Sequence, residues 1–138
     1  MKLRAAAAAV ALTLLVGAAA ASLGAAARAN AGAVHINIHY STFAPGSLDV
    51  EPGETVRFVI RNTDPIDHEF ILGDEAVQLA HEEGTEAHHA PRPGEVSVPA
   101  GETVVTTYTF PKSSGSLIFG CHLPGHYNFG MRGTVAIA

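Results

Sequence analysis

Hydrophobic and polar residues alternate along most of the chain after residue 31, and Gly and Pro interrupt the alternation at short intervals. Alternation with a period of two is typical of half-buried β-strands, and Gly and Pro are typical of the turns between them. The pattern predicts strands at 34–40, 47–50, 55–62, 68–72, 96–98, 103–110, 116–121 and 133–137. Seven or eight short strands at this spacing predict an all-β fold, a Greek-key β-sandwich.

One segment departs from this pattern. Residues 74–83 contain helix-forming residues and no Gly or Pro, and Gly84 follows them. This composition predicts one short helix, in a connection between the two sheets. A polar loop is the alternative, because Val77 and Ala80 make only a thin apolar stripe.

The first 31 residues have a different character from the rest. Residues 1–4 are basic, 5–27 form an apolar run without an acidic residue, and 29–31 form a small-x-small cleavage site. This is the pattern of an export signal, and we expect cleavage after Ala31. A retained membrane anchor is the alternative, although a run dominated by alanine is weakly hydrophobic. The remainder, 32–138, is then one domain, located in the periplasm, the cell envelope or the extracellular space.

Charge and length narrow the function further. The chain has 8 Lys and Arg against 13 Asp and Glu, a formal net charge of −5, and three of the basic residues lie in the predicted signal. Little positive charge is left to neutralise phosphates, so we expect no nucleic-acid binding. A domain of this size excludes a multidomain enzyme. No second apolar run is long enough to cross a membrane, and we expect a monomer without a membrane span.

Cysteine content raises a chemical question. The chain has a single cysteine, Cys121. Exported domains normally use cysteines in pairs, as disulfides. A single exported thiol is therefore a buried inert side chain, an intermolecular crosslink or a metal ligand.

The spacing around Cys121 favours a metal. Cys121, His126 and Met131 lie five residues apart between two predicted strands, and Pro and Gly at 124–125 supply a turn. A thiolate, an imidazole and a thioether are donors that suit both Cu(I) and Cu(II). His68, at the start of a predicted strand, is the best candidate for a second imidazole. A zinc site would leave the methionine unexplained.

These residues also carry a resemblance to a known family. The segment 119–131, with its C-x₄-H-x₄-M spacing and Leu-Pro-Gly-His core, resembles the ligand loop of the cupredoxins, small blue-copper proteins, and is most similar to those of auracyanin and rusticyanin. The resemblance covers most of 34–138. It implies one copper ion per chain, with His68, Cys121 and His126 as equatorial ligands and Met131 as the axial ligand.

The resemblance also implies a function: transfer of single electrons between Cu(II) and Cu(I), without enzymatic activity. A redox partner would dock transiently near His126, within an apolar shell supplied by Phe119, Leu123, Tyr127 and Phe129. A second resemblance supports an alternative. The segment 68–73 and the histidines that follow it resemble periplasmic cupredoxins of bacterial copper resistance, although the extra methionines common in those proteins are absent here.

The remaining histidines allow more than one interpretation. In copper nitrite reductases and multicopper oxidases, a His next to the ligand Cys carries electrons to a second copper; the alternative for His122 is a partly exposed or hydrogen-bonded side chain. His81, His88 and His89, among several glutamates, form either a low-affinity Cu(II) or Zn(II) site or a solvated acidic loop. His35 and His39 are expected to be solvated.

Overall fold

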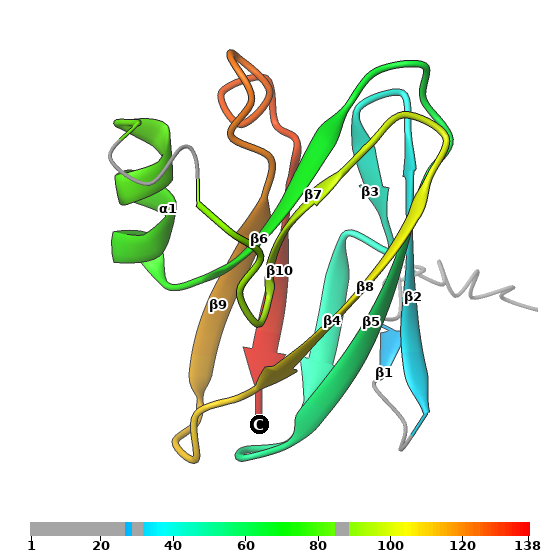
Figure 1. The fold of residues 1–138 in the computed structure, drawn as a ribbon. Helices are drawn as coiled ribbons and strands as arrows, with labels where there is room; N and C mark the ends of the chain where they lie inside the picture. Colours follow the sequence, from blue (N-terminus) through cyan, green and yellow to red (C-terminus); the bar gives the residue numbers. More distant parts are fainter. Residues whose placement is uncertain (1–26, 29–31, 85–88) are drawn as a thin grey trace, which may run out of the picture.

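A computed structural model describes residues 27–28, 32–84 and 89–138 of the chain. Two β-sheets face each other (Figure 1). One has the order β1-β4-β10-β9-β6-β7, and the other has the order β3-β2-β5-β8. The strands are β1 (Ala27–Arg28), β2 (Ala33–His39), β3 (Thr42–Ala44), β4 (Ser47–Val50), β5 (Thr55–Asn62), β6 (His68–Gly73), β7 (Glu95–Val98), β8 (Thr103–Thr109), β9 (Gly115–Gly120) and β10 (Arg132–Ile137).

The predicted β-sandwich is therefore confirmed. All eight predicted strands are present within one or two residues of their predicted ends, and β1 and β3 are additional. The predicted signal lies outside the described residues except for β1, which pairs with β4. No helix in the described part of the chain is long and apolar enough to cross a membrane.

The core lies between the sheets because each strand points alternate side chains inward. In β5, for example, Val56, Phe58 and Ile60 are buried. Phe70 from β6 packs against Phe58 with ring centroids 5.3 Å apart, and against Phe119 from β9 at 5.4 Å. Phe119 thus belongs to the core of the sandwich.

The added strand β3 forms a hairpin with β2 through the turn Tyr40-Ser41. Both residues have a positive φ, 50° and 51°. Such turns usually contain Gly, Asn or Asp, and this sequence gave no such signal. Here the carboxylate of Asp64 accepts hydrogen bonds from both backbone N–H groups, at 2.7 and 2.8 Å, and holds the turn.

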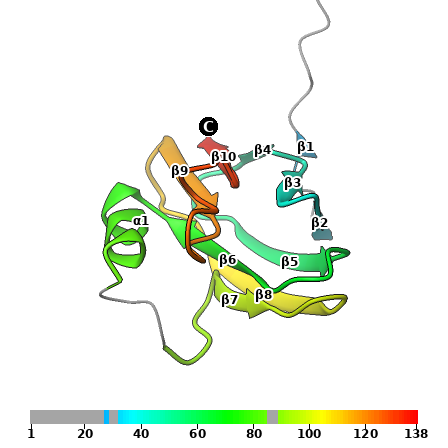
Figure 2. The ribbon, with the colours of Figure 1, turned by 90° about the horizontal axis from the view of Figure 1, so that it is seen from above.

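The predicted helix forms as α1 (Glu75–Glu82), with the Asp74 side chain accepting a bond from the N–H of Val77 at its start. The prediction that this helix connects one sheet to the other is wrong, because α1 joins β6 to β7, which are neighbours in the same sheet. Figure 2 shows it outside the sandwich, beside β9 and β6. The helix buries Gln78 and His81, so hydrogen bonding rather than an apolar stripe attaches it.

Strand pairing brings the candidate metal-binding residues together. β9 pairs with β10 on one side and with β6 on the other, both antiparallel. The start of β6 therefore lies at the same end of the sheet as the loop 121–131 between β9 and β10. That loop is the orange segment at the top of Figure 1.

Candidate metal centre

Three of the four predicted ligands converge in space. Sγ of Cys121 lies 3.2 Å from Nδ1 of His126 and 3.9 Å from Nδ1 of His68. All three atoms lie within 4.8 Å of one another. Cys121 and His68 are almost fully buried, and His126 is partly exposed.

The fourth predicted residue, Met131, is 2% exposed and belongs to the same buried cluster as Cys121. The backbone holds the ends of the loop together, since the N–H of Cys121 donates to the carbonyl of Met131 at 3.1 Å. The N–H of Met131 in turn donates to the carbonyl of His126 at 2.9 Å. These bonds fix the loop before any metal is considered.

Burial changes the protonation of the thiol. It raises the pKa of Cys121 from its ordinary value to about 11, a rise that N–H groups of Leu123 and Glu69 partly offset. The Glu69 N–H lies 3.3 Å from Sγ. A thiol with this pKa is neutral at neutral pH, so a metal ion must displace its proton to bind the sulfur.

The two imidazoles are prepared for binding in different ways. Burial, followed by repulsion from His68, lowers the pKa of His126, so its ring is neutral at neutral pH. Nε2 of His68 lies 2.9 Å from Oδ2 of Asp64. The Nε2–H donates to this carboxylate, which leaves a lone pair on Nδ1, the atom that faces Cys121.

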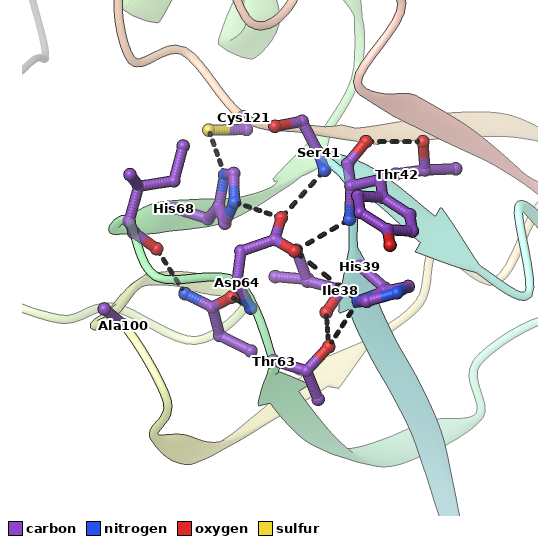
Figure 3. Close-up of polar contacts among 12 residues, drawn as sticks. Ile38, His39, Ser41, Thr42, Thr63, Asp64, His68, Ala100 and Cys121 are labelled. Atoms are coloured by element: carbon purple, nitrogen blue, oxygen red, sulfur yellow. Dashed lines mark hydrogen bonds and ion pairs between the residues drawn. The ribbon is translucent and has the colours of Figure 1, made fainter.

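Asp64 is the residue of this centre that sequence analysis missed. Figure 3 shows its carboxylate between the His68 ring and the backbone of the 40–41 turn. Burial raises the pKa of Asp64, but the bonds from Ser41, Tyr40 and His68 outweigh burial, and the net pKa is lowered. An ionised carboxylate therefore supports both the turn and the imidazole.

Asn62 fixes the segment that carries Asp64. This buried side chain donates to the carbonyls of Ile66, Val98 and Pro99, and its oxygen accepts the N–H of Asp64. The only sequence signal for this arrangement was a run of turn-forming residues, Asn62-Thr63-Asp64-Pro65, which indicated a turn and gave no indication of contact with a histidine.

The predicted apolar shell is only partly correct. Phe119 is buried in the core and Leu123 packs against it, but Tyr127 stacks on the His122 ring with centroids 4.5 Å apart. Phe129 is 94% exposed. The expectation is wrong for Phe129 because its side chain lies in solvent rather than against the centre.

The other histidines also have defined places. His122 is hydrogen-bonded, through Nδ1 to Glu82 and through Nε2 to Gln78. His35 and His39 are exposed, as expected, and Nδ1 of His39 bonds to Oγ1 of Thr63. His81 is buried, so the expectation of a solvated loop is wrong for it. His88 lies outside the described residues.

The donor set fits copper: one thiol, two imidazoles and a thioether in a buried setting. Comparison with known proteins agrees. The family described as "Copper binding proteins, plastocyanin/azurin family" matches residues 31–138. The chain belongs to this family of copper proteins, and its cofactor is one copper ion.

The chain is similar both to proteins named for copper resistance and to solved structures of auracyanin and rusticyanin. A "Copper-resistant cuproprotein CopI" from Rubrivivax gelatinosus is 42% identical over 99 residues, 69% of this chain and 59% of that protein, so the chain spans less than two thirds of its length. Auracyanin B aligns with a TM-score of 0.62 at 26% identity, covering 78% of this chain and 89% of the other. Rusticyanin from Thiobacillus ferrooxidans shares the fold, with a TM-score of 0.53 at 19% identity over 80% of each chain. The resemblances inferred from the sequence are confirmed.

Proposed function

We propose that the protein carries single electrons, without enzymatic activity, through a copper ion held by His68, Cys121, His126 and Met131. The observation that carries the proposal is the convergence of one sulfur and two imidazole nitrogens within 4.8 Å. His68 comes from the start of β6, and Cys121 and His126 come from a loop that backbone hydrogen bonds already fix. A site that changes little between oxidation states needs little reorganisation for each electron transferred.

Each residue has a distinct task in this proposal. When bound, copper supplies a reversible one-electron couple between Cu(II) and Cu(I). The Cys121 sulfur and the two imidazoles bind it, and the buried Met131 thioether is the weak fourth donor. Asp64 fixes the tautomer and orientation of the His68 ring. The surrounding core excludes water.

We further propose export to the periplasm or beyond, a monomeric state, and a transient redox partner that docks near His126. A pocket beside this histidine is lined by Tyr40, Ser41, Thr42, Phe129 and Gly130. Tyr40 is 84% exposed and Phe129 is 94% exposed. Exposed aromatic side chains around a partly exposed ligand support docking at this face.

Copper titration followed by the visible spectrum tests the centre. We expect an intense blue thiolate-to-Cu(II) band that saturates at one copper per chain, is absent in Cys121→Ser, and is kept in the surface control His35→Gln. The blue protein should then show a reversible one-electron wave in voltammetry. A colourless protein, or several coppers bound without the band, would contradict the proposal.

Copper handling in metal resistance is the second candidate, favoured by the 42% identity to a protein named for copper resistance. The two functions differ in what happens after reduction. An electron carrier keeps its copper in both oxidation states, whereas a handling protein gives it up. Incubation of the reduced protein with a Cu(I) chelator of graded affinity separates them, and rapid loss of copper to a weak chelator supports handling.

A further inference from the structure

We propose that His81, His89 and Glu95 form a second metal site, for a divalent cation of the Cu(II) or Zn(II) type. The residues come from the last turn of α1, the segment before β7, and β7 itself. The two Nε2 atoms lie 3.1 Å apart. Oε2 of Glu95 lies 3.0 Å from Nε2 of His89 and 3.6 Å from Nε2 of His81.

The hydrogen bonds of the two rings indicate a cation between them. Nδ1 of His81 donates to the carbonyl of Val77 at 2.9 Å, and Nδ1 of His89 donates to the carbonyl of Ala90 at 2.7 Å. A neutral imidazole has one N–H, so each Nε2 presents a lone pair. Two lone pairs facing each other at 3.1 Å repel, unless a proton on one of the two nitrogens or a metal cation lies between them. Bonds from the other ring nitrogen to a carbonyl are also typical of metal-binding histidines.

Glu95 gives independent support. Its Oε2 is a buried polar atom without a hydrogen-bond partner. A buried carboxylate oxygen in that state is costly, and native structures usually explain such an atom. Here it points at the two imidazole nitrogens. Arg92 Nη1 forms an ion pair with the same oxygen at 3.7 Å, from a side chain that is 49% exposed, and this distance is too long for a hydrogen bond.

Packing holds one of the three residues in place, and the other two are partly open to solvent. The His81 side chain is 3% exposed, and its ring packs on that of His122 with centroids 5.6 Å apart. The His89 and Glu95 side chains are each 15% exposed. All three residues line a cavity of about 520 Å³, which gives an ion a route from solvent.

The donor atoms select the class of metal. Two imidazoles and one carboxylate suit Zn(II) and Cu(II), and three protein ligands leave a position for water. Cu(I) prefers sulfur, and the chain has only two methionines and one cysteine, none of them among these three residues. The site therefore goes beyond the electron-carrier function, and its existence does not depend on that function.

The test is a titration of ZnCl₂ into the purified protein already loaded with one copper, followed by calorimetry and the visible spectrum. We expect one Zn(II) per chain with no change at the first centre. His89→Gln should weaken Zn(II) binding at least about tenfold. Loss of a residue that only hydrogen-bonds to a metal ligand already weakens binding by about this factor, so loss of a ligand should cost no less. Glu95→Gln should also weaken it, and the exposed control His35→Gln should not.

Cu(II) provides a second readout. A second equivalent should add an electron paramagnetic resonance signal distinct from the first, and His89→Gln should remove it. His89 lies outside the strands and helix, so this variant should fold, and unchanged loading of the first centre checks that it does. If the protein binds no ion beyond the first, the cluster holds a proton and forms a His–Glu ion pair, and the proposal is wrong. Equal affinity in both variants and the wild type would also overturn it.

Discussion

Burial raises the pKa of Cys121 to about 11, and in the proposed centre this determines how copper binds the sulfur. The metal-free thiol is protonated at pH 7, whereas burial lowers the pKa of His126 and leaves that imidazole neutral. We therefore expect Cu(II) binding at pH 7 to release about one proton per ion, from the thiol. Indicator measurements in weakly buffered solution would detect it. Release of no proton would mean that the thiolate already exists in the metal-free protein.

Asp64 allows a prediction about pH and stability. Its lowered pKa means that the ionised carboxylate stabilises the fold above the ordinary pKa of 3.8, and that this contribution is lost as pH falls through the lowered value. Asp64→Asn should cost about 1–3 kcal/mol at pH 7, because a charged acceptor of buried hydrogen bonds is lost.

The measurement is urea unfolding of the metal-free protein at pH 7 and in acid. The gap between wild type and Asp64→Asn should narrow in acid. Asp67→Asn is the matched control, since Asp67 lies in the same loop and accepts a backbone N–H from Ala100 but is exposed. An equal gap at both pH values would show that the carboxylate charge is not what matters.

Among single residues, the sequence predicts those whose side chains form an unusual set of metal-binding groups. A lone Cys, a His and a Met at equal spacing are rare together, so three residues of the centre could be predicted from one loop. Asp64 could not, because carboxylates are common and its partners lie 23 and 24 residues upstream in a turn without its usual residues. The full cluster of His81, His89 and Glu95 could not be predicted either, because these residues come from α1, the segment before β7 and β7 itself, and they come close only in the folded chain.

At the scale of elements, α1 is attached by polar contacts. Nε2 of Gln78 donates to the carbonyls of Ile71 in β6 and Ile118 in β9, and its Oε1 bonds to His122. Gln78→Ala leaves these buried groups without partners and should cost about 1–3 kcal/mol. Leu79→Ala, one residue along and 57% exposed, should change stability by less than about 0.5 kcal/mol. Urea midpoints compare the two, and equal effects would contradict this attachment.

The contact between β9 and β10 gives another prediction. A Cβ at Gly133 would lie 2.1 Å from Cζ of Phe119, inside the core next to the ligand loop. Gly133→Ala should therefore destabilise the protein by about 1–3 kcal/mol through overpacking. Gly115→Ala on β9, where a Cβ meets nothing within 4 Å, is the control. Thermal unfolding of both variants checks the difference. A stable Gly133→Ala would mean that both Phe119 and the Gly46 carbonyl, 2.7 Å from the added Cβ, can move aside.

The strands themselves were predictable, because alternation reports directly which side chains enter the core. The connections were less so. The hairpin of β2 and β3 has Tyr40 and Ser41 where turn residues were expected, and α1 packs through Gln78 and His81 rather than apolar side chains. In both cases a polar contact with a residue distant in the sequence stabilises the element: Asp64 holds the turn, and Gln78 bonds to Ile118. The residues of the element itself therefore do not reveal it.

For the whole molecule, the docking face near His126 predicts slower electron transfer when charge is placed there. Phe129→Lys should reduce the rate of exchange with a redox partner and leave the blue colour unchanged, because Phe129 is exposed and outside the core. Stopped-flow kinetics would measure the rate. Val105→Lys, on β8 in the opposite sheet, adds the same charge elsewhere. Equal rates in wild type and Phe129→Lys would exclude this face.

The proposed donors of the copper centre lie at the start of β6 and on the loop between β9 and β10, and these three strands are neighbours in one sheet. The facing sheet supplies none of them. The facing sheet is nevertheless linked to one of them, because the Asp64 carboxylate bonds both to the His68 ring and to the 40–41 turn between β2 and β3. Asp64 is thus a mechanical link between the layers: binding at the facing sheet that moved the β2–β3 turn would also move the His68 ring, and with it the geometry that sets the reduction potential.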